Sequence, residues 1–254
     1  MANSVIGYNN IINNATLSGG SWQTGFGIDK LKTRYLYQTA ISTSATGTVI
    51  MDFGSSVSVG VIGVIALGAT ITETSGSFQI IGSNNSDFTS PIYSFTDDLT
   101  SEIPNIVHDL GQAYSARYWK IIVVNQVSGF SIGRIFVGSR FQAAVNISYG
   151  ASFGYQSSTE VTESQGGCEF FYEKPTRRIA HVVFDSLTDN ETIIVDDIMQ
   201  AVGISGEVIF FRDPSDLTNK QRRNIYGRLS TLNALEVPYY DNYSSGFDII
   251  EIIA

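Results

Sequence analysis

Hydrophobic and polar residues alternate along most of the chain, in short apolar runs separated by turns of Gly, Ser, Asn and Thr. Because successive side chains of a strand point to opposite faces, this period of two predicts β-strands. A polar turn at Asn125–Gly129 joins the two clearest runs. The strands predicted in the first half are Tyr35–Ile41, Gly47–Phe53, Val59–Leu67, Gly76–Ile81, Ile92–Phe95, Ile106–Leu110, Ala116–Val124 and Phe130–Phe141.

The period changes in the second half of the chain. The segment Thr188-Asp189-Asn190-Glu191 matches a capping box, and apolar residues then recur at helical spacing up to Gly203. This pattern predicts one short amphipathic helix with Gly203 at its C-terminal end. The strands predicted around it are Gly166–Tyr172, Ile179–Phe184, Glu207–Phe211, Tyr226–Leu232 and Phe247–Ile253, of which the last is expected to pair at a sheet edge.

These patterns predict a mainly β protein in three parts. Residues 1–20 are rich in Asn, Ser, Thr and Gly without either period, and we expect an N-terminal arm that packs on a neighbouring subunit. Residues 21–143 have the many short strands of a jelly-roll β-sandwich. Residues 144–254 form a separate module of strands with one α-helix.

Four segments of the first half resemble the discoidin-like, galactose-binding-like domains. They are Val49–Gly54, Phe78–Asn84, Arg117–Ile121 and Ile132–Gly138, in the order of that family, within a similarity over residues 20–141. The resemblance implies an eight-stranded jelly roll whose loops at one end often bind sugars or lipid headgroups. The four segments belong to the framework, so no ligand-binding residue is carried over from the family.

The second half resembles the small split β-barrel of phage distal tail proteins and related minor tail proteins. The resemblance covers about residues 145–254 and rests on the order of Phe184, the helix from Asp189, the strand ending in an Asp-Pro turn, and the closing Phe247–Ile252 strand. It implies a ring of subunits at the distal tail or baseplate, joining the tail tube to the hub or tip. A discoidin-like module placed before the barrel departs from the common arrangement of that family.

Composition and charge narrow the classes of function. One cysteine and two histidines are too few for a disulfide framework or a His/Cys metal cluster. A calcium site built from oxygen ligands alone stays open, but no Asp-x-Asp-x-Asp spacing supports it, so we predict no metal. We also predict no cofactor. A net charge of -9 argues against nucleic-acid binding. The longest apolar run, Val57–Leu67, is interrupted and too short to cross a bilayer. With no secretion signal at the N-terminus, we expect a soluble protein made in a cytoplasm without membrane insertion.

Exposed tryptophan and tyrosine rings can stack on a sugar ring, and Trp22, Tyr35 and Tyr37 are the candidates by residue type and position. The alternative interpretation is that they fill the sandwich or a subunit contact. The basic cluster of Arg222, Arg223 and Arg228 is interpreted as the solvated face of a short helix or turn rather than as a phosphate site.

We do not expect an enzyme. No serine lies in a Gly-x-Ser-x-Gly elbow, and adjacent carboxylates on strands or helices point apart. A glycosidase pair of carboxylates from distant strands is the alternative that stays open, and no residue pattern supports it. His108 and His181 are interpreted as core or edge residues, and Cys168 as a small buried hydrophobic residue.

The predicted function is a structural virion protein of a phage tail, assembled in the host cytoplasm as a homo-oligomeric ring that contacts other tail proteins. An outer domain that binds a host surface glycan is compatible with this role. The alternative is a lectin-like, carbohydrate-binding module for host-surface recognition without a ring. We also predict that deleting residues 247–254 prevents assembly or folding.

Overall fold

The computed structural model is mainly β and antiparallel, which confirms the predicted fold class. It describes residues 2–67, 76–99, 105–124, 129–216, 219–240 and 242–253. Strands of the first half are β1 (Val5–Tyr8), β2 (Thr16–Ser18), β3 (Ala40–Ile41), β4 (Gly47–Leu67), β5 (Gly76–Ser83), β6 (Pro91–Leu99), β7 (Asn105–Val124) and β8 (Ser131–Phe141). Two 3₁₀ turns, η1 (Ile12–Asn14) and η2 (Ile28–Lys32), lie among them.

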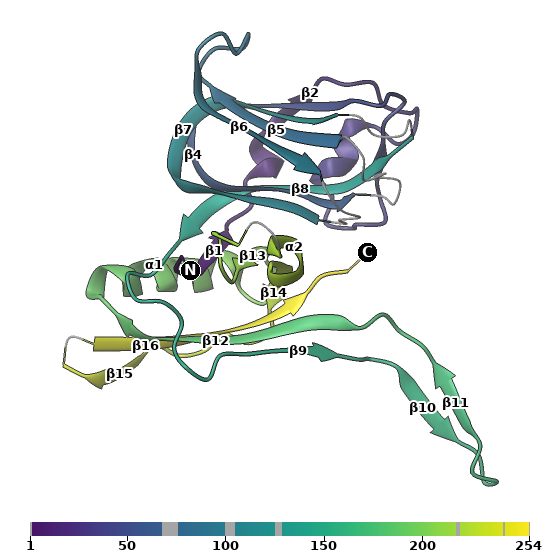
Figure 1. The fold of residues 1–254 in the computed structure, drawn as a ribbon, viewed down its shortest axis with the longest axis vertical. Coiled ribbons are helices and arrows are strands. Elements are labelled where there is room, and N and C mark those ends of the chain that lie inside the picture. The colour runs from purple at the N-terminus through teal and green to yellow at the C-terminus, as the bar shows by residue number, and fades with distance from the viewer. Residues whose placement is uncertain are drawn as a thin grey trace.

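The second half contains the helix α1 (Asp189–Val202) and the one-turn helix α2 (Lys220–Arg223). Its strands are β9 (Ser152–Gln156), β10 (Glu160–Glu163), β11 (Glu169–Tyr172), β12 (Arg177–Leu187), β13 (Val208–Phe211), β14 (Ile225–Leu229), β15 (Glu236–Tyr239) and β16 (Asn242–Glu251). Figure 1 shows the two halves as separate bodies in contact, with one hairpin extending away from the second. We refer to them as the first module and the second module.

Two long strands, β4 and β7, pair along most of their length and bend together in the first module (Figure 1). Their register shifts between Asp52 and Val57. Gly54 and Gly111 adopt φ angles of 75° and 81° at the bends, a conformation that a residue without a Cβ accepts readily. Bulges and bends of this kind let a strand leave one layer of a sandwich and continue in the other.

These bends correct the predicted strand boundaries. The strands predicted at residues 47–53 and 59–67 are two parts of β4, and those at 106–110 and 116–124 are two parts of β7. Of the strand predicted at Tyr35–Ile41, only Ala40–Ile41 is extended and paired, because a turn occupies the preceding residues. In the predicted turn at 125–129, residues 125–128 lie outside the described residues, and Gly129 has a φ angle of 89°.

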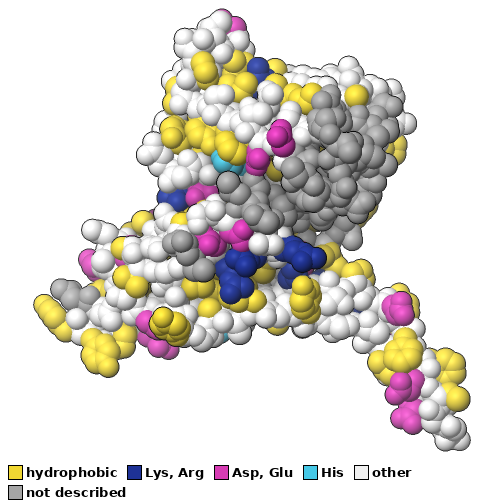
Figure 2. Space-filling model, viewed as in Figure 1, with side chains coloured by type: hydrophobic (Ala, Val, Ile, Leu, Met, Phe, Trp, Pro, Cys, Tyr) yellow, Lys and Arg dark blue, Asp and Glu magenta, His cyan; other side chains and the backbone are white. Residues whose placement is uncertain are grey.

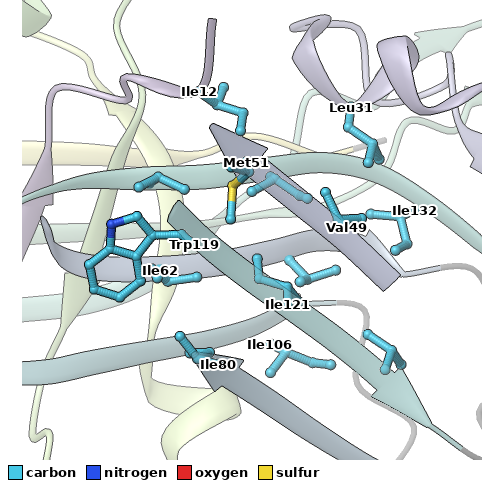
Figure 3. Close-up of a cluster of buried hydrophobic side chains, with 14 of the residues drawn as sticks. Ile12, Leu31, Val49, Met51, Ile62, Ile80, Ile106, Trp119, Ile121 and Ile132 are labelled. Atoms are coloured by element: carbon cyan, nitrogen blue, oxygen red, sulfur yellow. The ribbon is translucent and has the colours of Figure 1, made fainter. Parts of the chain in front are cut away.

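The core of the first module lies between its two layers and is centred on Trp119 of β7, which is fully buried (Figure 3). Met51 of β4 and Ile121 of β7 lie beside it, and Ile12 and Leu31 close the core from the two 3₁₀ turns. The predicted alternation of Trp119, Ile121 and Val123 is confirmed, since all three face this core. Burial of this apolar surface is the main stabilising term for the module.

The second module is an antiparallel sheet in the order β1-β13-β14-β16-β12-β9, with α1 packed on its core. The predicted capping box is confirmed: Glu191 accepts hydrogen bonds from the backbone N–H of Thr188 at 2.8 Å and from its hydroxyl at 2.7 Å. Val195, Ile198 and Val202 of α1 are buried against the sheet, as the helical spacing predicted. Gly203 ends the helix and has a φ angle of 53°.

The strand β1 joins the two modules into one hydrogen-bonded sheet. It pairs with β8 of the first module through Ile6 and Phe141, and with β13 of the second through Ile6 and Phe210. A separate buried cluster at the junction contains Val5, Phe136 and Ile209 among its members. The expected N-terminal arm is therefore wrong for residues 5–8, because their apolar side chains are buried within the chain itself.

The closing strand β16 lies inside the sheet rather than at an edge. It pairs with β12 on one side and β14 on the other, for example through Ile249 with Ala180 and with Leu229. Phe247 and Ile249 are buried, so the alternation predicted for this segment is confirmed while its expected edge position is wrong. The placement of the domain boundary at residue 143 stays a prediction, because the hydrogen bonds of β1 cross it.

Candidate functional site

An exposed pair of tyrosines, Tyr35 and Tyr37, lies on a turn between η2 and β3. The backbone N–H of Gln38 donates to the carbonyl of Tyr35 at 2.9 Å and closes the turn. Leu36 is buried in the junction cluster and anchors the turn, so its two neighbours face outward. The exposed fractions of Tyr35 and Tyr37 are 61% and 72%, and their ring centroids lie 5.7 Å apart at an interplanar angle of 40°.

These two rings form an angled aromatic platform on the protein surface. Neither ring fills the sandwich, so the alternative that they belong to the core does not hold for this pair. An exposed aromatic ring offers an apolar face and, in tyrosine, a hydroxyl that can donate or accept hydrogen bonds. The turn therefore exposes both apolar ring faces and hydroxyl groups to solvent.

Trp22, the third predicted site residue, lies elsewhere. It forms an isolated bridge with Ser42, and its indole Nε1–H donates to the carbonyl of Gly19 at 2.8 Å. The side chain is partly buried and packs against the core of the first module. Among the described residues, the ring contact of this turn joins Tyr35 to Tyr37 and does not include Trp22. The structure thus brings together two of the three predicted residues.

A charged network that the sequence did not reveal lies next to the tyrosine turn. Arg34, which precedes Tyr35, places its Nε 3.5 Å from Oε1 of Glu207. Glu207 is buried and also binds Arg134, whose Nη2 lies 2.8 Å from the same oxygen. A small polar cavity of about 140 Å³ is lined by these three residues and by Asn9, Asn10, Asn13, Ala201, Val202 and Gly206.

This network links the modules because Arg134 belongs to β8 and Glu207 precedes β13. Asn10 donates to Oε2 of Glu207 at 2.5 Å, and Arg134 also donates to the carbonyl of Lys32. Burial raises the pKa of the nearby Tyr226 phenol, and the negative charge of Glu207 adds to that rise. The arrangement fixes the segment that carries the tyrosine turn against the second module.

A larger groove of about 830 Å³ lies on the second module. Its floor includes the partly buried Ile147, Ala151 and Phe153, and its rim carries the exposed side chains of Tyr149 and Arg212. The guanidinium carbon of Arg212 lies 4.1 Å from the centre of the Phe153 ring. Of the remaining lining residues, Arg223 pairs with Asp216 at 2.6 Å.

Asp248, His181 and Ser152 form a row across three strands and have the residue types of a serine-hydrolase triad. His181 of β12 is the cross-strand partner of Asp248 in β16 and of Ser152 in β9. Asp248 Oδ1 lies 2.5 Å from His181 Nδ1. In the described part of the chain, Ser152 makes no hydrogen bond to His181, and the groove described above does not include this row. The row therefore lacks the nucleophile contact of an acyl-transfer site.

The environment of the Asp248 carboxylate nevertheless leads us to predict that the stability of the fold depends on pH. Burial by itself would raise its pKa, but hydrogen bonds from Asn233, His181 and Thr231 together lower the pKa below the ordinary value of 3.8. A carboxylate whose pKa is lower in the folded state than in the unfolded state stabilises the fold above its unfolded-state pKa. This stabilisation is lost as the pH falls through its folded-state pKa. We expect the midpoint of thermal unfolding to fall less between about pH 5 and about pH 2 in Asp248→Asn than in the wild type.

Differential scanning calorimetry at several pH values measures this difference. The matched control is Asp196→Asn, because Asp196 is exposed on α1 and belongs to no hydrogen-bonded cluster among the described residues. Identical pH profiles for the wild type and Asp248→Asn would contradict the prediction.

The structure differs from the sequence interpretation at His181 and at Cys168. His181 is about half exposed instead of lying in the core or at a sheet edge, because it faces away from the core on β12, a strand paired on both sides. Cys168 is exposed at the turn between β10 and β11 instead of being buried. His108 stacks on Phe95 with ring centroids 3.6 Å apart, and its Nε2 lies 2.5 Å from the hydroxyl of Tyr93.

A metal-ligand cluster and a helix able to span a membrane are both absent from the described residues. There, no group of three or more His, Cys, Asp or Glu side chains is arranged to hold a metal ion. None of the described helices has both the length and the apolar character needed to cross a bilayer.

No protein-family model matches this chain, and no match was found among curated proteins. Solved structures of carbohydrate-binding modules are similar to about half of it. Chitosan-binding module 1 of a chitosanase/glucanase from Paenibacillus sp. IK-5 is 19% identical with a TM-score of 0.42, and the match covers 51% of this chain and 98% of the module. A family 32 carbohydrate-binding module from C. perfringens, in complex with galactose, is 15% identical with a TM-score of 0.42, over 53% and 99% of the two chains. The lectin domain of lectinolysin, complexed with the Lewis B antigen, is 15% identical with a TM-score of 0.40, over 51% and 94%.

Proposed function

We propose that this protein binds carbohydrate through the turn that carries Tyr35 and Tyr37. The observation that carries the proposal is the pair of exposed rings, 5.7 Å apart, on a turn anchored by the buried Leu36. Sugar rings have apolar C–H faces that pack on aromatic side chains, while their hydroxyl groups need polar partners at the rim. Arg34 and Gln38 flank the pair and supply such partners.

Replacing both tyrosines is expected to remove most of this affinity. The double variant Tyr35→Ala/Tyr37→Ala loses two stacking faces, each contributing about 1 kcal/mol, so we expect roughly tenfold or greater weakening of binding. Isothermal titration calorimetry on the full chain measures the effect. Chitosan oligosaccharides, galactose and the Lewis B antigen are the first probes, because they are the ligands named for the similar structures.

The control is Tyr239→Ala, which removes a tyrosine of similar exposure, 75%, from β15 of the other module. We expect its affinity to equal that of the wild type. Binding that survives the double variant at the turn, or that is lost equally in the control, would refute this site.

A ring-forming structural protein of a phage tail is the second candidate function. The observation that favours it is the hairpin of β10 and β11, which extends from the second module (Figure 1). Exposed apolar side chains lie on both faces of this hairpin. In that role the chain would form a homo-oligomer in the virion and contact the tail tube, hub or tip. The mass of the purified chain in solution, followed by negative-stain images of the particle it comes from, tests this candidate.

A further inference from the structure

The hairpin of β10 and β11 has a face that lacks partners within its own chain. Cross-strand pairing places Val161 opposite Phe171 and Glu163 opposite Glu169. Since directly opposed residues share one face of a hairpin, these four side chains lie together, and we call them the hairpin face. Val161 and Phe171 are 56% and 59% exposed.

The two carboxylates of the hairpin face oppose each other without a counter-charge. Neither Glu163 nor Glu169 makes an ion pair or a side-chain hydrogen bond in the described part of the chain. Like charges directly opposite across two strands are destabilising. On the other face, by contrast, Glu160 already pairs with Lys174, whose Nζ also lies 5.3 Å from the centre of the Tyr172 ring.

A two-stranded hairpin is marginal in water without a surface to pack on. Figure 2 shows this one projecting into solvent with hydrophobic and acidic side chains exposed, and Figure 1 shows it directed away from its own module. The surface that would cover the hairpin face therefore has to come from another molecule.

The groove on the second module has the complementary chemistry. Its floor is apolar, at Ile147, Ala151 and Phe153. Arg212 on its rim is exposed and has no carboxylate partner among the described residues. Arg222 and Arg223 of α2 are exposed close by in the fold, and Figure 2 shows Lys and Arg side chains gathered over this part of the second module.

The two carboxylates that line the groove are already engaged within the chain. Asp213 is buried and accepts hydrogen bonds from the hydroxyl of Ser215 at 2.6 Å and from the backbone N–H of Ala2 at 3.1 Å. Asp185 accepts a hydrogen bond from the hydroxyl of Ser244 at 3.2 Å. Arg223 in the lining already pairs with Asp216, so among the described lining residues Arg212 is the charge left to receive an incoming carboxylate.

We propose that the hairpin face of one copy docks in the groove of a second copy, with Val161 and Phe171 on the apolar floor and Glu163 and Glu169 against Arg212. The two surfaces are different parts of the molecule, so the contact is head-to-tail and repeats from copy to copy into a ring or a filament. This inference does not depend on sugar binding. It specifies the contact that the ring-forming candidate requires, and a chain that binds sugar while remaining monomeric would separate the two proposals.

If these charges pair between copies, reversing the charge on either surface should weaken association, and reversing both charges together should restore it. Sedimentation velocity on the full chain should show association that increases with concentration and weakens with added salt. Glu169→Arg and Arg212→Glu are each expected to weaken association by about tenfold or more, and the double variant Glu169→Arg/Arg212→Glu is expected to restore most of it. Glu236→Arg, on the exposed strand β15, is the control with the same change in charge.

The single cysteine supplies a geometric test of the same contact. Cys168 lies at the exposed end of the hairpin, so a short bismaleimide cross-links the wild type into dimers at most. Tyr149→Cys adds a thiol on the rim of the groove and is expected to give a ladder of trimers and larger species, whereas Tyr239→Cys is not. A monomer at all concentrations, a double charge variant without rescue, or equal ladders from both cysteine variants would overturn the proposal.

Discussion

Replacing Glu207 with leucine is expected to lower the free energy of unfolding by about 3–5 kcal/mol, because the change leaves the Arg134 guanidinium buried without a counter-charge. The side chains of Arg134 and Glu207 are 1% and 3% exposed. At that depth the remaining charge is hydrated much less well than it would be at the surface. Urea unfolding followed by far-ultraviolet circular dichroism measures the loss.

The double variant Arg134→Met/Glu207→Leu removes both charges. It therefore distinguishes the destabilisation caused by one unpaired charge from the net contribution of the ion pair to the free energy of unfolding. An apolar replacement of a buried ion pair is often neutral, so the double variant is expected to recover most of the stability. Asp52→Asn is the surface control, since the Asp52–Arg117 pair is partly exposed and its removal is expected to have little effect. A Glu207→Leu protein as stable as the wild type would show that the network contributes nothing to the junction.

A chain that ends at Gly246 is expected not to fold its second module. The deletion of residues 247–254 removes all of the register pairs that join β16 to β14 and part of its pairing with β12. It also removes the buried side chains of Phe247 and Ile249, and truncating each of these alone costs about 3–5 and 2–5 kcal/mol. Together these losses approach or exceed the roughly 5–15 kcal/mol that stabilises a typical domain.

Hydrogen exchange measured by mass spectrometry locates the effect. We expect β12 and β14 to lose protection in the shortened chain, while β7 around the buried Trp119 keeps it, because that core is formed entirely by the first module. A chain ending at Ile252 is the control, since β16 ends at Glu251 and its pairing is retained. Full protection of β12 in the chain ending at Gly246 would show that the closing strand is dispensable.

Local patterns predicted the elements that depend on neighbours in sequence. The capping box, the apolar positions at helical spacing and the glycine after them predicted α1 from Asp189 to Val202. The alternation around Trp119 predicted the core face of β7. Where strands bend, the same patterns predicted two elements in place of one, because a polar stretch with a glycine is typical of a turn as well as of a bulge.

The candidate site was predictable only in part. Residue type pointed to Trp22, Tyr35 and Tyr37, but exposure depends on where each ring packs. The burial of Leu36 turns two of the rings outward, and the bridge between Trp22 and Ser42 holds the third against the sandwich. The groove and the unpaired Arg212 had no sequence signal, since their parts are brought together from well-separated segments.

The sequence by itself determined a mainly β chain with a single long helix and a change of period near residue 145, because alternation and helical spacing are properties of consecutive residues. The tertiary structure alone decided that Val5–Tyr8 joins the two halves, that β16 is an inner strand, and that Arg134 and Glu207 meet. Arg134 and Glu207 are 73 positions apart in the sequence. Their pairing, like the order of the strands, depends on which surfaces pack together, and local patterns along the chain carry no information about that packing.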